Sequence, residues 1–213
     1  MRRVFVALWA VLAIARAEPI EHGLVSIGEI SPPLLAEIPY ATRYNFTGEV
    51  LYPFPAAWVH RDVAEALRKV QAELWEEGLG LKIFDGYRPL SVQQKMWDLI
   101  QDERYVSNPA VNRGRHTRGT AVDVTLVDKM GNELEMPTGF DDFTEAAHRD
   151  SKTMTPEQRK NMMKLQEVMA KHGFEPYPYE WWHYDFRGWK DYPVLDIPFE
   201  ELASGTKVTE PVP

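Results

Sequence analysis

His116 and Asp123 stand seven residues apart with Gly119 between them, and this spacing restricts the local fold strongly. In a continuous strand, an odd separation places two side chains on opposite faces. The two can converge only if the chain turns, and glycine allows a turn readily. We therefore predict that His116 lies in a loop and Asp123 on the following strand, at residues 121–127. A hydrogen-bonded loop pair is the alternative for this motif taken alone.

Glu180 and His183 form a second candidate pair, three residues apart. Such positions share a face of a helix but not of a flat strand, and the aromatic residues within 181–186 favour a strand. A bend after Glu180 would let His183 bind a metal ion while Glu180 approaches the ion's water. The alternative is a solvated Glu180 and a histidine hydrogen-bonded among its aromatic neighbours.

Arg88 is the third candidate. Residues 81–84 predict a strand, and Asp85 with the following glycine predicts the turn after it. Arg88 precedes a proline, so its backbone is expected to be extended. From there its guanidinium could reach a developing oxyanion. An ion pair with Asp85 or Asp98 is the alternative.

The 213-residue chain contains no cysteine, which excludes disulfides and thiolate metal sites. A zinc ion would therefore be held by histidine and carboxylate. Two imidazoles and one carboxylate form a common zinc shell with a position open for water. The HExxH, GxSxG, P-loop and GxGxxG patterns of other enzyme classes do not occur in the sequence.

The N-terminus has the pattern of a secretory signal peptide. Two arginines precede an apolar run at residues 4–14, and residues 15–17 form a small-x-small cleavage site. The run is too short to span a bilayer comfortably, and an uncleaved anchor is the alternative. We expect a signal peptide at 1–17, a mature domain at 18–213, export across the inner membrane to the periplasm, and no stable membrane insertion after cleavage.

The charge balance restricts the partners. The formal net charge is −8, and removal of residues 1–17, which carry three arginines and no acid, takes it to −11. An acidic chain disfavours nucleic acid and anionic membrane surfaces as partners. We therefore expect a soluble exported enzyme that acts on a small substrate.

Helix and strand signals are mixed along the chain and predict one α+β domain, with no repeat or long linker. The expected elements are irregular wrapping with short strands at 18–55, helices at 55–77, 91–102 and 156–172, and strands at 81–84, 121–127 and 181–186. Ser91 is expected to cap the second helix. A turn at 131–132 brings Val124 near Leu134 and favours antiparallel pairing. We predict a small antiparallel sheet packed with helices, with the metal site at the sheet.

Together these motifs resemble the VanX-type D-alanyl-D-alanine dipeptidases, in the wider zinc D-Ala-D-Ala peptidase group, peptidase family M15. The resemblance covers most of the mature chain in a consistent order. It is carried by residues 40–42, 45–48, Asp85-Gly86-Tyr87-Arg88-Pro89, the motif from His116 to Asp123, 136–141, 173–175 and Glu180-Trp181-Trp182-His183-Tyr184.

The resemblance implies a role for each candidate and for one further residue. These are His116, Asp123 and His183 as ligands of one Zn²⁺ per subunit, Glu180 as general base, Arg88 as transition-state stabiliser and Asp141 near the substrate amine. The implied reaction is hydrolysis of the dipeptide D-alanyl-D-alanine to two D-alanines by a metal-activated water. An exported D,D-carboxypeptidase acting on peptidoglycan stem peptides is one alternative. A zinc-dependent binding module without catalysis is the other.

Two positions depart from the family pattern. Gly114 stands where the family usually has serine, so a hydroxyl that could contact substrate is missing. Pro137 follows Met136 where the family has glycine, which bears on the amine pocket. The first departure affects substrate specificity rather than zinc binding.

Overall fold

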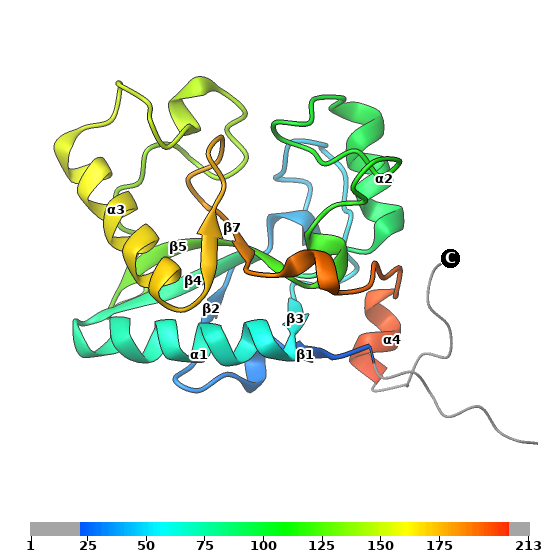
Figure 1. Ribbon diagram of the computed structural model, residues 1–213, viewed down its shortest axis with the longest axis horizontal. Coiled ribbons are helices and arrows are strands. Elements are labelled where there is room, and N and C mark those ends of the chain that lie inside the picture. The colour runs from blue at the N-terminus through cyan, green and yellow to red at the C-terminus, as the bar shows by residue number, and fades with distance from the viewer. Residues whose placement is uncertain (1–21, 205–213) are drawn as a thin grey trace, which may run out of the picture.

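The computed structural model describes residues 22–204, in which a five-stranded sheet carries most of the regular β-structure. The sheet order is β2 (Leu35–Ala36), β4 (Leu79–Asp85), β5 (Ala121–Asp128), β7 (His183–Phe186) and β6 (Phe174–Pro176). All neighbours are antiparallel except β2 and β4. A second, antiparallel pair consists of β1 (Leu24–Ser26) and β3 (Trp58–His60) (Figure 1). The predicted α+β class is confirmed, and the parallel edge strand and second sheet are additions to it.

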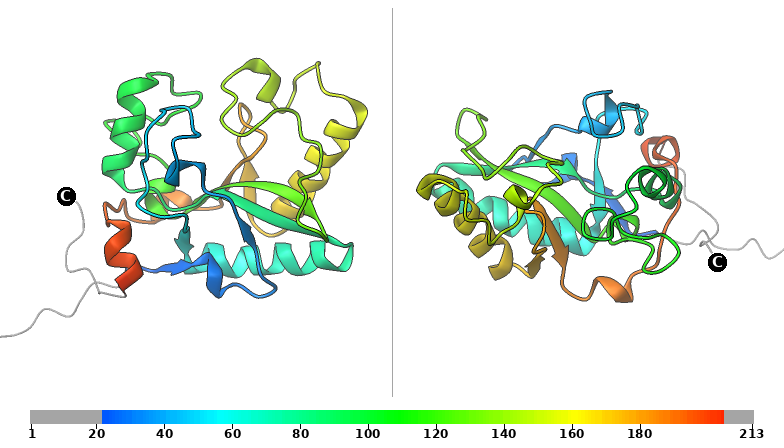
Figure 2. Two further views of the ribbon diagram at one scale, coloured as in Figure 1. Left: turned by 180° about the vertical axis from the view of Figure 1, so that it is seen from behind. Right: turned by 90° about the horizontal axis from the view of Figure 1, so that it is seen from above.

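The helices pack around this sheet. α1 (Arg61–Glu76) contacts β4, α3 (Pro156–Lys171) contacts β6, and the two helices contact each other. α2 (Leu90–Leu99) and the short α4 (Phe199–Ser204) lie at the opposite end of the molecule from α3 (Figures 1 and 2). The buried residues of α1 recur at helical spacing along its sequence.

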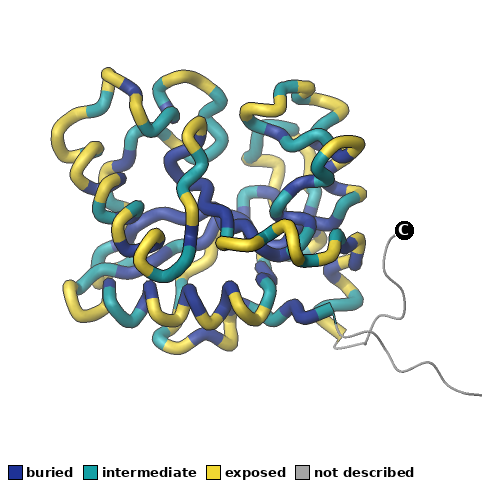
Figure 3. The backbone as a smooth tube through the Cα atoms, in the orientation of Figure 1, coloured by how far each residue is buried: buried dark blue, intermediate teal, exposed yellow. Residues whose placement is uncertain are grey.

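The central strands are deeply buried. β4, β5 and β7 run through the dark interior of the tube in Figure 3, and every residue of β5 except Asp128 is buried. Helices and loops therefore cover both faces of β5. Its polar residues Asp123 and Thr125 lie inside the protein, where a polar group needs hydrogen-bonding or ionic partners.

Three predicted boundaries are wrong. The helix expected from residue 55 begins at Arg61, because Trp58–His60 pairs with β1 and His60 then caps α1. α2 begins at Leu90, so Ser91 lies within it and donates its backbone N–H to Asp196 Oδ1. α2 also ends at Leu99, short of the predicted position.

The strand predicted at 181–186 is limited to β7, because the two tryptophans before it lie in a bend. The hairpin also has a different register. Leu134 donates its N–H to Leu126 O rather than pairing with Val124, and the partner segment forms an isolated bridge instead of a strand.

Other predictions are confirmed. α3 starts at Pro156, with Thr155 and Gln158 in a reciprocal capping box, and ends before His172. The segment before residue 58 contains only β1, β2 and two 3₁₀ turns among its described residues, which fits irregular wrapping. Within residues 22–204, none of the helices has both the length and the apolar composition needed to cross a bilayer. The signal peptide predicted at 1–17 lies outside the described residues.

Candidate metal centre

Three adjacent strands place polar side chains in one row. Asp85 on β4 stands opposite Asp123 on β5, and Asp123 stands opposite His183 on β7. Residues directly opposite each other on neighbouring strands share a face of the sheet and lie close together. All three side chains are buried. The register of the sheet alone therefore brings Asp85, Asp123 and His183 together, without any contribution from the loops.

A β-bulge is needed for this row. The pairing runs from Ile83 opposite Val124 to Asp85 opposite Asp123, so Phe84 is the extra residue on β4. Without the extra residue, Phe84 rather than Asp85 would stand opposite Asp123. Bulges of this kind are frequent beside active sites, where they re-aim a side chain.

His116 reaches the row through a tight turn. It begins a 3₁₀ turn, His116–Arg118, which ends at Gly119 in the left-handed region with φ of 67°. A Cβ atom at Gly119 would lie 2.5 Å from Leu24 Cδ2 and 3.0 Å from the backbone nitrogen of His60. Glycine is therefore required for both conformation and space. The structure confirms the predicted arrangement of a turn followed by a strand.

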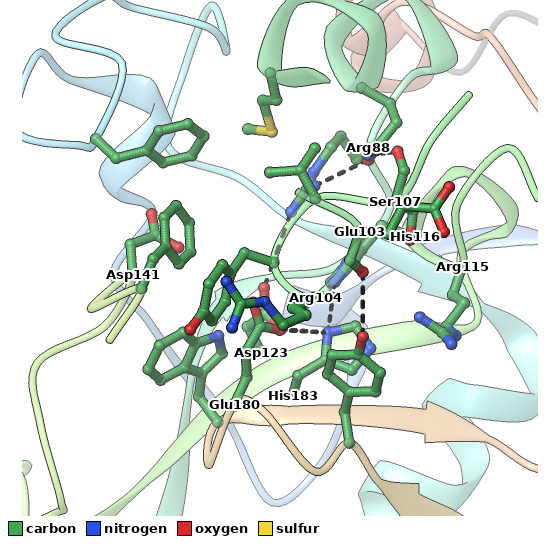
Figure 4. A pocket seen from close by; sticks show the side chains of 18 of the residues that line it. Arg88, Glu103, Arg104, Ser107, Arg115, His116, Asp123, Asp141, Glu180 and His183 are labelled. Atoms are coloured by element: carbon green, nitrogen blue, oxygen red, sulfur yellow. Dashed lines mark hydrogen bonds and ion pairs between the residues drawn. The ribbon is translucent and has the colours of Figure 1, made fainter. Parts of the chain in front are cut away.

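The ligand atoms of His116, Asp123 and His183 all lie within 4.8 Å of one another (Figure 4). Nε2 of His116 lies 3.2 Å from Nδ1 of His183, and Asp123 Oδ1 lies 3.4 Å and 3.0 Å from these two nitrogens. The remaining ring nitrogens point to other acceptors: His116 Nδ1 to Gly86 O at 2.7 Å and His183 Nε2 to Asp185 Oδ1 at 2.9 Å. Two nitrogens and one oxygen thus converge, a donor set that suits zinc.

The electrostatics of this cluster favour a positive charge at its centre. Burial by itself would raise the pKa of Asp123, but His116 and His183 together lower it below its ordinary range. Burial likewise acts to lower the pKa of His183, yet Asp185 and Asp123 raise it to about 10. These carboxylates compensate a buried cation, which is the charge that a metal ion would carry.

Arg88 lies beside the cluster, where Asp85 and Gln93 hold its guanidinium. Its Nη2 and Nε donate to Asp85 Oδ2 at 2.7 Å and 3.1 Å, and its Nη1 donates to Gln93 Oε1 at 2.9 Å. Nη2 also lies 4.0 Å from Asp123 Oδ2. The alternative ion pair with Asp85 is therefore present, whereas Asp98 bonds to Gln94. The ion pair fixes Arg88 at the wall of the pocket rather than removing it from the site.

Glu180 lies directly before the bend of residues 181–182 that leads into β7, as the spacing of the motif requires. Its Oε2 lies 3.7 Å from His183 Nδ1, and its side chain lines the same pocket. Burial is the main cause that raises the pKa of this carboxyl well above the ordinary value. A buried carboxyl with a raised pKa can both accept and return a proton.

Asp141 also lines the pocket and has a strained backbone with φ of 60°. Tyr40 donates its hydroxyl to Asp141 Oδ1 at 3.0 Å, while Oδ2 is buried without a hydrogen-bond partner among the described residues. Burial, reinforced by the charge of Asp123, raises the pKa of Asp141 well above its ordinary value. This carboxyl can receive a cationic or hydrogen-bond-donating group.

Two loops contribute aromatic side chains to the lining of the pocket. Tyr105, from the loop after α2, stacks on Phe143 with ring centroids 5.1 Å apart, and its hydroxyl lies 3.1 Å from His148 Nε2. His148 therefore contacts this loop and is not part of the metal cluster. Tyr105, Gln93 and Asp185 were missed by sequence reasoning. Only Asp185 had a local signal, since it stands two residues after His183 on one face of a strand.

A pocket with this donor set and a buried carboxyl beside it defines a metallohydrolase. Sequence comparison gives the family. The peptidase M15 family, described as D-ala-D-ala dipeptidase, matches residues 20–201. The chain belongs to this family and is a metallopeptidase.

Two relatives known from their sequences agree with that assignment. The chain is 36% identical to the D-alanyl-D-alanine dipeptidase of Escherichia coli (strain K12), over 85% of this chain and 93% of that protein. It is 30% identical to the D-alanyl-D-alanine dipeptidase of Enterococcus faecalis, over 77% and 91% of the two chains. Among solved structures, VanYB in complex with D-alanine-D-alanine is similar at 16% identity and a TM-score of 0.42, over 71% of this chain and 86% of that chain.

Proposed function

We propose that this protein is a zinc dipeptidase that hydrolyses D-alanyl-D-alanine to two D-alanines. The observation that carries the proposal is the convergence of the His116, Asp123 and His183 ligand atoms within 4.8 Å, at a pocket that Glu180 and Arg88 also line. The substrate is taken from the names of the relatives, which are D-alanyl-D-alanine dipeptidases.

The three ligands would hold one Zn²⁺ per subunit, which, when bound, supplies an activated water and polarises the scissile carbonyl. Glu180 accepts the proton of the attacking water. Burial makes this carboxyl a stronger base than an exposed one, and it then passes the proton to the departing amine. The same group thus acts first as a base and then as an acid.

Arg88 stabilises the oxyanion that develops on the substrate. Asp85 and Gln93 already hold its guanidinium, so its N–H donors need little reorganisation during the reaction. The third alternative, a binding module without catalysis, does not explain why a buried carboxyl and a fixed guanidinium both face the ligand cluster.

Asp141 is proposed to bind the free amino group of the substrate. Its Oδ2 is buried and unpaired among the described residues, and an ammonium group would supply the missing donor. Tyr105 and Phe143 stack on each other and also line the pocket. An anionic group that binds a free amine favours a dipeptide over a longer chain with an acylated residue at that position.

A panel of three substrates tests the proposal: the zinc-loaded protein is incubated with D-Ala-D-Ala, L-Ala-L-Ala and N-acetyl-D-Ala-D-Ala, and released alanine is measured. We expect rapid hydrolysis of D-Ala-D-Ala only. Hydrolysis of the acetylated substrate alone would instead support the D,D-carboxypeptidase alternative. A zinc-saturated protein that cleaves none of the three would support the binding-module alternative.

We also propose that the protein is exported to the periplasm and that residues 1–17 are removed. The support is the composition of that segment, with its basic start, short apolar run and small-x-small end. Cell fractionation and N-terminal sequencing test this, with Glu18 expected as the first residue of the mature chain. A cytoplasmic protein with an intact N-terminus would contradict it.

A further inference from the structure

The two histidines of the metal cluster are held by different acceptors. His116 directs Nδ1 to the carbonyl oxygen of Gly86 at 2.7 Å, whereas His183 directs Nε2 to the carboxylate of Asp185 at 2.9 Å. A neutral imidazole carries one N–H, so each acceptor selects the nitrogen that keeps the proton. The free lone pairs are then on Nε2 of His116 and Nδ1 of His183, the two nitrogens that converge.

The sheet explains the position of Asp185. It stands two residues after His183 on β7, so both side chains project from one face. In the register with β5, Asp185 lies opposite Ala121, while His183 lies opposite Asp123. The small side chain of Ala121 occupies little of the space above the sheet, and the Asp185 carboxylate bends back to the imidazole. Asp185 is buried, with 7% of its surface exposed.

Arg115 holds the other oxygen of the same carboxylate. Its Nε lies 2.9 Å from Asp185 Oδ2 in an ion pair, although the geometry is not that of a hydrogen bond and this buried Nε has no hydrogen-bond partner among residues 22–204. The guanidinium also lies over the rings of Tyr177, at 4.9 Å, and Trp189, at 5.2 Å. Two aromatic faces and one carboxylate restrict this guanidinium. The ion pair therefore stabilises the charged Asp185 carboxylate beside His183 Nε2.

Arg115 also joins the two ligand segments. It directly precedes His116 in the chain and forms the N-terminal cap position of the turn that carries this histidine. Through Asp185, the backbone of one ligand is thus linked to the ring of the other. A shift of the turn relative to β7 would break this link at Asp185.

We propose that Asp185 is a positioning residue for His183 and that Arg115 holds Asp185, so that the pair sets the affinity and geometry of the metal site. The proposal rests on the zinc site of the proposed function. Partners of this kind orient a ligating imidazole and increase its basicity, and their removal typically reduces metal affinity by about 10- to 100-fold. We expect a loss of that size for Asp185→Ala and a smaller one for Asp185→Asn, whose amide oxygen can still accept from Nε2.

The control for charge is Glu175→Gln. Glu175 stands opposite Asp185 in the register with β6 and carries the same charge, but it is exposed and pairs with Arg187. The corresponding control for Arg115→Gln is Arg187→Gln. Each control changes the net charge by the same amount as the variant that it matches. Both lie near the same strand, without contact to either ligand ring.

Zinc affinity is measured by competition with a chromophoric chelator, and the Co²⁺-substituted proteins are compared by their visible absorption. We expect Asp185→Ala to weaken zinc binding about 10- to 100-fold and to shift the Co²⁺ bands. Arg115→Gln should produce a change in the same direction, and Asp185→Asn should restore part of the affinity. The Glu175→Gln and Arg187→Gln proteins should match the parent.

Equal zinc affinity and unchanged Co²⁺ bands in Asp185→Ala and the parent would overturn the proposal. If Asp185→Ala does not fold, the nearly isosteric Asp185→Asn decides, and parental affinity together with parental Co²⁺ bands in that variant would overturn it as well. The outcome is independent of catalysis. A parent that binds zinc without cleaving D-Ala-D-Ala would contradict the proposed substrate and leave this inference standing.

Discussion

The ladder between β4 and β5 has two ends with opposite character. Toward one end Leu81 faces Leu126, and the next pair on the same face of the sheet, Ile83 and Val124, is also aliphatic. At the other end Asp85 faces Asp123, and all of these side chains are buried. Like charges directly opposite each other destabilise a sheet, whereas buried aliphatic pairs stabilise it. The same two strands thus provide the stability at one end and the chemistry at the other.

The acidic end is tolerated because each of its carboxylates has polar partners. Arg88 binds Asp85, and both histidines contact Asp123. Even so, burial, together with the charge of Asp123, raises the pKa of Asp85. Substitutions at the acidic end should therefore change activity more than stability, and substitutions at the aliphatic end should do the reverse.

The largest effect is expected for Glu180→Gln. The amide cannot accept a proton, so kcat/KM for D-Ala-D-Ala should fall by about 10²- to 10⁴-fold. Zinc content should remain at the parental value, because Glu180 is not among the proposed ligands. Steady-state kinetics and elemental analysis measure the two quantities. Turnover close to that of the parent would remove Glu180 from the mechanism.

At the aliphatic end, Leu81→Ala should lower the free energy of unfolding by about 2–5 kcal/mol, because it leaves a cavity at a residue with no exposed surface. The folded fraction should keep its kcat. Chemical denaturation with urea measures the loss, and Leu99→Ala, at a side chain that is 60% exposed, is the control. An equal loss of kcat in the folded protein would show that the two ends are not separable.

Arg88→Lys should lower kcat by about 10²-fold, with a smaller change in KM. Lysine keeps the positive charge beside Asp85 but cannot reproduce the fork of N–H donors that a guanidinium offers. Arg68→Lys, an exposed residue paired with Glu65, should have no effect on either constant. A change confined to KM would instead assign Arg88 to substrate binding.

The smallest effect is expected for Asp141→Asn, and its sign depends on pH. Because the folded protein raises the pKa of Asp141, the unfolded chain loses this proton at lower pH than the folded chain does. The contribution of Asp141 to the free energy of unfolding is therefore fully present below the ordinary pKa of 3.8 and is lost as the pH rises. Asparagine does not titrate, so the variant should be more stable than the parent at pH 7 and lose that advantage near pH 3.

Thermal denaturation of the chelator-treated proteins at both pH values measures this difference. Asp128→Asn is a control whose effect on stability should have the opposite sign. Hydrogen bonds from Asn132 lower the pKa of Asp128, so replacing this carboxylate should reduce the stability at pH 7. In the zinc-loaded protein, Asp141→Asn should also raise KM for D-Ala-D-Ala. If Asp141→Asn were less stable than the parent at pH 7, the buried Asp141 carboxyl would not destabilise the folded protein at that pH, and the prediction would be wrong.

Much of the site was predictable from short segments. The odd spacing of His116 and Asp123 required a turn, and Gly119 provides it. The spacing of Glu180 and His183 required a bend before the strand, which is where β7 begins. The helix predicted from residue 156 likewise begins at Pro156. These features depend on backbone conformation over a few residues, which local sequence determines.

The tertiary structure decided how the segments meet. The extra residue at Phe84 brings Asp85 opposite Asp123, and only the pairing of β4 with β5 reveals it. The contacts of Arg115 with Asp185 depend on the register of β7 and on a turn far away in the sequence. The sequence by itself determined which groups can carry the chemistry and the local turns that present them. The fold selected their partners and the ring nitrogens that face the centre, because cross-strand register and hydrogen bonds between distant segments are set only when the whole sheet is assembled.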